Sequence, residues 1–268
     1  MIACLPMYAL PEMATANAAL WSALAAELEP EAPEVLTPSP LALPDEIAPD
    51  TLFSQMCGYP LQKIYQGQYR LLGTPLYDLP GCRLRPDGLP THCSFLIVGA
   101  ASGFGVPAQL RGARFAMNGR DSNSGMNLAR SLFAPLAREG RFFGEVLTSG
   151  SHLRSIEMVA ADLADAATID CVTYGFAARY RPELTARLRV LAETPASPAI
   201  PFITAAATSA ALTARLTRIL TDPLPALALA ASLAGLSIRR VAPPRPVAYA
   251  EILRLEEEAV ALGYPVLA

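Results

Sequence analysis

The sequence predicts an α/β fold, and two observations carry this prediction. Short apolar runs of strand length alternate with longer segments whose apolar residues recur at helical spacing. Glycine, proline and small polar residues separate these runs, as expected for connections between the elements of a layered protein. The chain has 268 residues, which is long enough to bury one or two hydrophobic cores.

The predicted elements follow one another along the chain. Strands are expected at residues 2–7, 52–56, 69–73, 93–98, 114–117, 145–147, 166–169 and 188–191. Helices are expected at residues 12–28, 124–134, 151–161, 171–180, 212–220, 226–233 and 247–262. Residues 75–90 are rich in proline and glycine and are expected to form a loop. The last portion of the chain, from about residue 212, is predicted to be mainly helical.

The order of these elements predicts two lobes. Residues 1–98 and 196–268 would form one lobe, and residues 99–195 would form an inserted second lobe. The two crossing segments would be the hinge. Glycines follow the strand at 93–98, but their spacing is not GxGxxG, so a hinge explains them better than a dinucleotide site. Open α/β sheets bind ligands beyond the carboxyl ends of their strands, so a cleft between the lobes is the expected site.

Composition excludes several classes of function. The formal charge of −3 without a run of basic residues argues against nucleic acid as a partner. Five cysteines without a CxxC pair, and only two histidines, give no recognisable metal site, and no cofactor is indicated. The serine-nucleophile motifs GxSxG and SxxK are absent. No segment resembles a membrane span. Without a signal sequence we expect a cytoplasmic protein as written, or a periplasmic one if a leader has been removed.

A cluster of small polar residues marks the beginning of the helix expected at residues 124–134. The stretch NGRDSNSGM places Ser122, Asn123, Ser124 and Gly125 at this helix start. A helix start offers unpaired backbone N–H groups and a partial positive charge, and short hydroxyl side chains add donors without filling the space. One interpretation is helix capping by a serine. The other is that the cluster binds a small oxyanion.

A second helix start favours the anion hypothesis. The stretch TSGSHLRS places His152 in the first turn of the helix expected at residues 151–161. The other histidine, His92, lies at the start of the crossing strand expected at residues 93–98. Both histidines would therefore lie near the predicted cleft.

Two carboxylates flank the strand expected at residues 166–169. Asp165 precedes this strand and Asp170 follows it. Such a pair could perform acid/base catalysis, accept a proton carried by a bound anion, or meet a ligand ammonium. The structural alternatives are a turn at Asp165 and helix capping by Asp170.

Beyond these features, the chain resembles the substrate-binding components of phosphonate, phosphite and phosphate ABC transporters. The similar stretches are FSQMCGYPL, GTPLYDLPGC, THCSFLIV, LRGARFAMNGRDSNSGM, TSGSHLRSIEMVA, ADAATIDCVTY and LRVLAETPASPAIPFIT, in family order from about residue 50 to 204. The resemblance implies a two-lobed, type II periplasmic-binding-protein fold with a two-segment hinge and a ligand cleft between the lobes.

The resemblance also implies site residues. The family holds its oxyanion with the serine-rich helix start, which corresponds here to Ser122, Asn123 and Ser124. The family histidine corresponds to His152, and its acidic position to Asp165, with Asp170 as the weaker candidate. His92 stands where the family usually has a tyrosine. Tyr8 and Tyr59 are expected to line the other lobe.

These observations lead to one principal hypothesis and two alternatives. The principal hypothesis is a non-enzymatic solute-binding protein that closes around phosphate, phosphite or a phosphonate, with an ABC permease as its partner. The first alternative is a cytoplasmic enzyme on the same scaffold that acts on a carboxylated or phosphorylated metabolite. The second is a sensor that binds an anion and reports to a partner.

Overall fold

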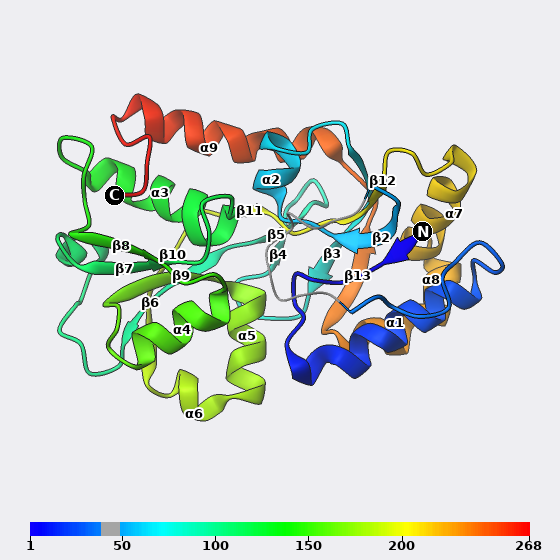
Figure 1. Ribbon diagram of the computed structural model, residues 1–268, viewed down its shortest axis with the longest axis horizontal. Helices are drawn as coiled ribbons and strands as arrows, with labels where there is room; N and C mark the ends of the chain where they lie inside the picture. Colours follow the sequence, from blue (N-terminus) through cyan, green and yellow to red (C-terminus); the bar gives the residue numbers. More distant parts are fainter. Residues whose placement is uncertain (39–48) are drawn as a thin grey trace. The chain divides into compact units, whose positions relative to one another are not determined.

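The computed structural model describes residues 1–38 and 49–268 (Figure 1). These residues form two compact units, and each unit is assembled from separate stretches of the chain. The first unit comprises Met1–Asp78, Cys82–Thr91 and Pro198–Tyr249. The second comprises Leu79–Gly81, His92–Ser197 and Ala250–Ala268. Among the described residues, no helix combines the length and apolar character needed to cross a membrane.

The first unit contains a five-stranded sheet in the order β1-β2-β12-β3-β13. Its strands are β1 (Ile2–Ala3), β2 (Thr51–Gln55), β12 (Phe202–Ala205), β3 (Tyr69–Tyr77) and β13 (Ile238–Ala242). Its helices are α1 (Ala14–Ala26), α2 (Gly58–Lys63), α7 (Ala210–Thr221) and α8 (Pro223–Gly235), with 3-10 turns at Pro11–Met13 and Pro246–Tyr249. A short antiparallel pair, β4 (Arg83–Leu84) and β5 (Pro90–His92), lies before the chain enters the second unit.

Stacked aromatic rings join helix α1 to the sheet of the first unit. Trp21 stacks on Phe53 of β2 with ring centroids 5.8 Å apart, and Phe53 stacks on Phe202 of β12 at 5.0 Å. All three side chains are buried. Each such pair contributes about 0.5–1.5 kcal/mol beyond its buried area, so this column fixes α1 on the sheet.

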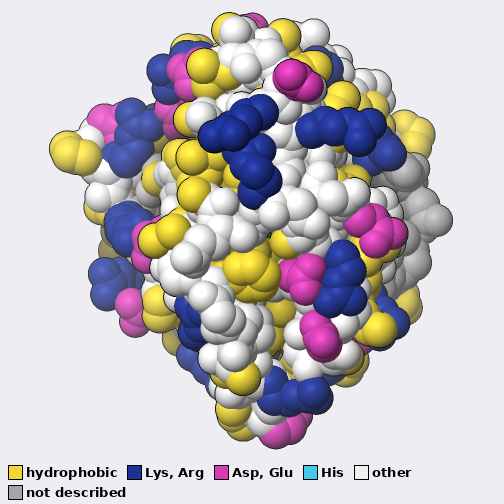
Figure 2. Space-filling model, turned by 90° about the vertical axis from the view of Figure 1, so that its left-hand side faces the viewer, with side chains coloured by type: hydrophobic (Ala, Val, Ile, Leu, Met, Phe, Trp, Pro, Cys, Tyr) yellow, Lys and Arg dark blue, Asp and Glu magenta, His cyan; other side chains and the backbone are white. Residues whose placement is uncertain are grey.

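The second unit contains a five-stranded sheet in the order β10-β6-β9-β7-β8. Its strands are β10 (Leu188–Glu193), β6 (Ser94–Gly99), β9 (Ala166–Asp170), β7 (Arg114–Met117) and β8 (Glu145–Thr148). Its helices are a π-helical turn at Asn123–Asn127, α3 (Leu128–Phe133), α4 (His152–Ala160), α5 (Cys171–Tyr180), α6 (Pro182–Thr185) and α9 (Ala250–Ala261), with 3-10 turns at Pro107–Leu110 and Ala134–Leu136. The short β11 (Ser197–Pro198) lies where the chain returns to the first unit. On the face shown in Figure 2, basic and acidic side chains are interspersed.

Helix α9 belongs to the second unit, whereas the sequence boundaries placed residues 196–268 in the first lobe. The reason is packing against α3. The Asn127 amide donates to the carbonyl of Ile252 at 3.0 Å, and the Arg130 guanidinium donates to the carbonyl of Pro265 at 2.9 Å. The chain thus crosses between the units once more, between Tyr249 and Ala250.

Most predicted elements of the second unit lie within one or two residues of the observed ones, and the main errors fall in the first unit. Strand β13 lies in the portion that was predicted to be mainly helical, and β12 lies just before it, where no strand was predicted. Strand β3 extends to Tyr77, into the expected loop at residues 75–90. Both missed strands pair antiparallel with β3. Their strand character therefore depends on a partner distant in sequence, which a local pattern does not report.

Candidate functional site

Polar residues next to the strand ends lie together at one edge of the sheet in the second unit. Strand β7 runs parallel to both β8 and β9, so their carboxyl ends lie at the same edge. The π-helical turn follows β7, α4 follows β8, and α5 follows β9. Strand β6 runs antiparallel to β9, with Ser94 opposite Asp170, so β6 begins at this edge. The topology therefore brings Ser122, Asn123, Ser124, His152, Asp170 and His92 to one edge of one sheet.

The helix start after β7 is held in an open conformation by Ser122. The Ser122 hydroxyl oxygen accepts a hydrogen bond from the N–H of Gly125 at 2.9 Å, and its carbonyl accepts from the N–H of Asn127 at 3.0 Å. The latter bond spans five residues and gives this turn its π-helical form, which recurs at functional sites. The N–H of Ser124 has no acceptor among the described residues. Together with the hydroxyl hydrogen of Ser122, it can donate to an anion at this helix start.

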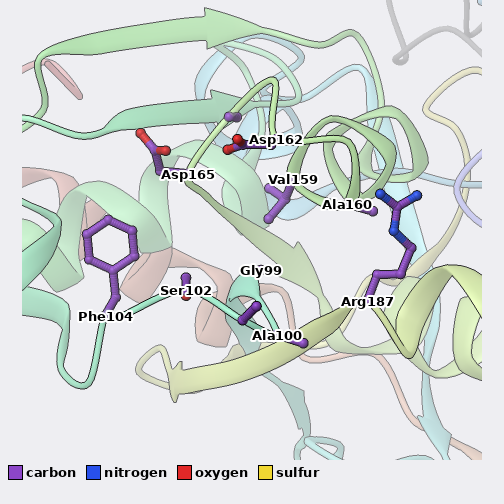
Figure 3. Close-up of a pocket in the computed structure, with 11 residues that line it drawn as sticks. Gly99, Ala100, Ser102, Phe104, Val159, Ala160, Asp162, Asp165 and Arg187 are labelled. Carbon is purple, nitrogen blue, oxygen red and sulfur yellow. The ribbon is translucent and has the colours of Figure 1, made fainter.

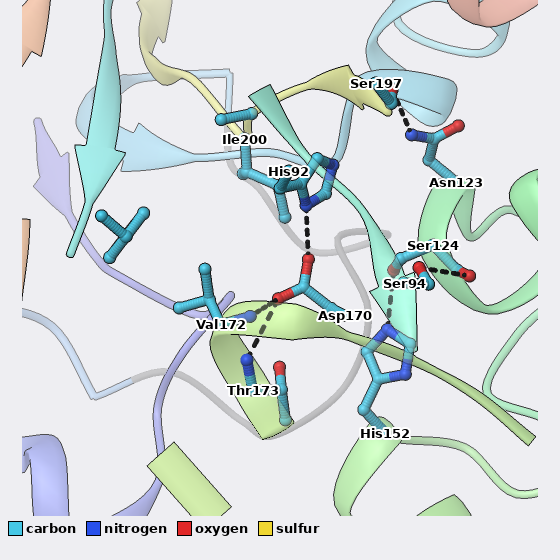
Figure 4. A network of polar contacts seen from close by, with 12 residues as sticks. His92, Ser94, Asn123, Ser124, His152, Asp170, Val172, Thr173, Ser197 and Ile200 are labelled. Carbon is cyan, nitrogen blue, oxygen red and sulfur yellow. Dashed lines mark hydrogen bonds and ion pairs between the residues drawn. The ribbon is translucent and has the colours of Figure 1, made fainter. Parts of the chain in front are cut away.

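Ser124 is held from two sides. Its hydroxyl lies 2.7 Å from Nε2 of His152, and its carbonyl accepts a hydrogen bond from the hydroxyl of Ser94 at 2.9 Å (Figure 4). Nδ1 of His152 is buried, although the residue as a whole keeps partial exposure. Nδ1 lies near the carbonyl of Thr168 but forms no hydrogen bond of normal geometry with it.

Burial keeps His152 neutral. Desolvation lowers the pKa of His152 to about 4, against the opposing effect of the Asp170 charge, while the charge of His92 lowers it further. At neutral pH this histidine therefore acts as a hydrogen-bond partner of Ser124 and carries no charge.

His92 and Asp170 form a buried pair beside this helix start. Nδ1 of His92 lies 2.6 Å from one carboxylate oxygen of Asp170, and both side chains are almost fully buried. The other oxygen accepts the N–H groups of Val172 at 2.9 Å and Thr173 at 3.1 Å, and so caps helix α5. Burial opposes ionisation of Asp170, but the charge and hydrogen bond of His92 and the charge of His152 outweigh it and lower its pKa. Asp170 is therefore both the helix cap and the partner of a histidine.

A series of side-chain hydrogen bonds positions the amide of Asn123. The Arg130 guanidinium donates to Oδ1 of Asn127 at 2.7 Å, and Nδ2 of Asn127 donates to Oδ1 of Asn123 at 3.0 Å. Nδ2 of Asn123 in turn donates to the hydroxyl of Ser197 at 2.9 Å (Figure 4). Because guanidinium has only donors, it dictates which way both amides face. One of the two amide hydrogens of Asn123 thus points to the chain crossing at Ser197.

Gly125 lets Asn118 and His152 pack closely against the helix start. A Cβ atom at this position would lie 1.8 Å from Oδ1 of Asn118 and 3.2 Å from Cε1 of His152. Any larger residue would displace either the end of β7 or the histidine. The glycine is therefore needed for packing at this helix start.

The structure does not bring Asp165 to this edge. Asp165 precedes β9, whereas Asp170 ends it, so the two carboxylates lie at opposite ends of the strand. Asp165 pairs instead with Arg114 at the start of β7, with an N–O distance of 2.8 Å. Hydrogen bonds from Arg114 lower the pKa of Asp165 despite partial burial. Asp165 also lines a cavity of about 530 Å³ with Asp162 and Arg187 (Figure 3).

The two tyrosines expected to line the other lobe lie in the first unit. Tyr8 is buried and packs edge-on against Tyr77, with ring centroids 5.4 Å apart. Tyr59 is buried within α2. Both remain predictions as ligand residues.

Sequence reasoning missed several residues that support the site, namely Ser94, Asn118, Asn127, Arg130 and Ser197. Two of them carried a usable signal. Ser94 lies two residues from His92, which places both side chains on one face of an extended segment, and Asn127 lies one helical turn after Asn123. The contacts of Arg130 and Ser197 come from residues distant in sequence and left no local signal. Within residues 1–38 and 49–268, no group of three or more His, Cys, Asp or Glu could hold a metal ion.

Several solved structures share the fold of this chain. PhnD1 from Prochlorococcus marinus, solved with methylphosphonate, is 14% identical with a TM-score of 0.68, and the match covers 96% of each chain. A binding protein component of an ABC phosphonate transporter from Pseudomonas aeruginosa is 17% identical with a TM-score of 0.66, over 79% of this chain and 69% of that one. XAC2383 from Xanthomonas citri, bound to ATP, is 15% identical with a TM-score of 0.66, over 98% of each chain. At these identities the similarity establishes the fold, and the predicted fold class is confirmed.

The family is established by sequence. The family described as ABC transporter, phosphonate, periplasmic substrate-binding protein matches residues 64–249, which is more than half of the chain. The chain therefore belongs to this family of phosphonate-transporter substrate-binding proteins. The family consists of periplasmic binding proteins and not of enzymes, so the predicted absence of an enzymatic role is confirmed. No curated protein matches the chain.

Proposed function

We propose that this protein binds a phosphonate- or phosphate-like oxyanion at the helix start Ser122–Ser124. The observation that carries the proposal is the geometry of Ser124, whose N–H is available while its hydroxyl is fixed on the neutral His152. Family membership and the methylphosphonate complex of PhnD1 support this chemical class of ligand. Hydrogen bonds to a charged partner contribute about 1.5–3 kcal/mol each, so a few such donors suffice for a small anion.

The proposal extends to transport. As a periplasmic member of its family, the protein would close its two units around the anion and deliver it to an ABC permease. Small-angle scattering with and without ligand tests closure, because closure reduces the radius of gyration. An unchanged radius at saturation would contradict this extension and leave anion binding intact.

Isothermal titration calorimetry tests the binding proposal directly. The titrants are phosphate, phosphite, methylphosphonate, aminoethylphosphonate and sulfate. We expect at least one phosphorus oxyanion to bind, and Ser122→Ala, which removes a hydroxyl donor of the helix start, to weaken it about tenfold or more, since roughly 1.4 kcal/mol corresponds to a tenfold change.

A matched control separates binding from helix capping. Ser209 caps helix α7 in the first unit, where its hydroxyl accepts from the N–H of Leu212 at 3.2 Å. Ser122→Ala and Ser209→Ala each remove one serine cap, at a cost of about 1 kcal/mol of stability. Only Ser122→Ala should also weaken anion binding. If the wild-type protein bound none of the five anions, the proposal would fail.

A further inference from the structure

The most conspicuous unused group at this edge is Nε2 of His92. His92 is 1% exposed, its Nδ1 is engaged by Asp170, and its Nε2 is buried without a hydrogen-bond partner among the described residues. Buried polar atoms are nearly always paired, so an unpaired one in a native site requires an explanation.

The partners of Asp170 define where the proton of His92 lies. An ionised carboxylate only accepts hydrogen bonds, and Asp170 already accepts from two backbone N–H groups in addition to the histidine. Nδ1 of His92 therefore carries a hydrogen. Nε2 then offers either a lone pair or, when the ring is protonated, a second N–H.

Strand geometry directs His92 toward the helix start. His92 and Ser94 lie two residues apart in an extended segment, so their side chains project from the same face. The hydroxyl of Ser94 reaches the carbonyl of Ser124 at 2.9 Å. His92 and Ser94 thus project from one face of this segment, and the His92 ring turns Nδ1 toward Asp170 and its other nitrogen away from that carboxylate (Figure 4).

Two titratable groups of the second unit act on His92. Asp170, at the junction of β9 and α5, favours the charged imidazole, and His152, in the first turn of α4, is held neutral by burial. Arg130 is committed elsewhere, to Asn127, Glu256 and the carbonyl of Pro265. Among these groups, His92 is the one able to supply positive charge beside Ser124.

We propose that His92, supported by Asp170, binds the oxyanion as an imidazolium through its Nε2–H, and that anion binding holds the proton on this ring. The inference rests on the proposed function, because it assumes an anion at Ser122–Ser124. The only covalent change is proton transfer: the acid form of the buffer gives a proton to Nε2 and becomes its conjugate base, and the anion stabilises the new N–H. The site therefore favours a doubly charged oxyanion, because the bound histidine lies between two negative partners, the ligand and Asp170.

Nitrogen-15 NMR of the histidine rings tests this inference in the complete protein. The chain contains two histidines, so specific labelling gives two imidazole spin systems, and His152→Gln assigns them. With saturating methylphosphonate or inorganic phosphate, we expect both nitrogens of His92 to carry hydrogens.

Calorimetry of His92→Gln gives an independent readout. Glutamine keeps an Nε2 donor without a charge, so this variant should bind the anion more weakly. It should also lose the proton uptake that accompanies binding, which is measured by repeating the titration in buffers of different ionisation enthalpy. The ligand contributes its own protonation change equally to both proteins, so the difference isolates His92. If His92→Gln does not fold, the NMR measurement on the wild type remains decisive.

The outcomes separate this inference from the proposed function. Anion binding with a lone pair on Nε2 of His92 would overturn the inference and leave the proposed function standing. Absence of binding by any tested anion would overturn both.

Discussion

The hydroxyl of Ser124 and Nε2 of His152 lie 2.7 Å apart, and burial holds that imidazole neutral. This contact links the anion site to the pH dependence of folding. The unfolded histidine titrates near its ordinary pKa of 6.5, and the folded one near a pKa of about 4. Between these values the unfolded chain binds more protons than the folded chain, so stability rises with pH across this window.

We therefore expect the protein to lose about 2–3 kcal/mol of unfolding free energy through His152 alone as pH falls from 7 to 4.5. Urea denaturation at several pH values measures this loss. His152→Gln removes the titrating group and should flatten the dependence in this window. An equally steep dependence in the variant would assign the acid sensitivity to other groups.

The second prediction concerns Gly125. Because a Cβ at this position would lie 1.8 Å from Oδ1 of Asn118, Gly125→Ala must displace either Asn118 or the helix start. We expect anion affinity to fall about tenfold or more. Gly103→Ala is the control, since a Cβ there meets nothing within 4 Å. Equal affinities of the two variants in calorimetry would show that the helix start tolerates the shift.

A third prediction concerns the buried Arg130. Arg130→Met leaves Oδ1 of Asn127 and the carbonyl of Pro265 without their charged donor. Removing one partner of a buried charged network costs about 3–5 kcal/mol. Arg254→Met, which breaks the exposed pair with Glu258, should cost less than about 1 kcal/mol. Urea titration of both variants compares the two effects.

The fourth prediction separates the two carboxylates of β9. Asp165→Asn should reduce stability, because Asp165 binds Arg114 through its side chain and through the backbone N–H. It should leave anion affinity within about twofold, a difference below 0.5 kcal/mol. Asp170→Asn keeps a good helix cap but removes the charge facing His92, so anion binding should weaken. Calorimetry on both variants distinguishes them, and a large affinity loss in Asp165→Asn would contradict this division.

The sequence patterns around the site were informative because each candidate residue lies next to a strand that is recognisable in the sequence. Each predicted residue of the shared edge follows or precedes a strand with a clear sequence pattern, as Ser122 does after β7 and His152 after β8. Parallel pairing of these strands then suffices to bring the residues together. The serine cluster, both histidines and Asp170 could therefore be proposed before the structure.

The remaining features depend on contacts between distant residues. The sequence placed Asp165 and Asp170 at the two ends of one short strand, but family resemblance favoured the former, and only the sheet shows that it faces Arg114. The unit boundary failed for a similar reason. The sequence of helix α9 is amphipathic, which predicts that one face is buried. It does not indicate that this face packs against α3 and not against the helices of the first unit.

The membership of α9 in the second unit has a consequence for biosynthesis. The segment that ends at Ser197 leaves the ribosome well before Ala250 is added, so for that interval Asn127 and Arg130 lack the carbonyls they will later meet. The turn at Asn123–Asn127 then lacks these hydrogen bonds until the first-unit segment Pro198–Tyr249 has been translated. The turn at Asn123–Asn127 consequently gains its last hydrogen-bond partners late, after nearly all of the described chain has been made.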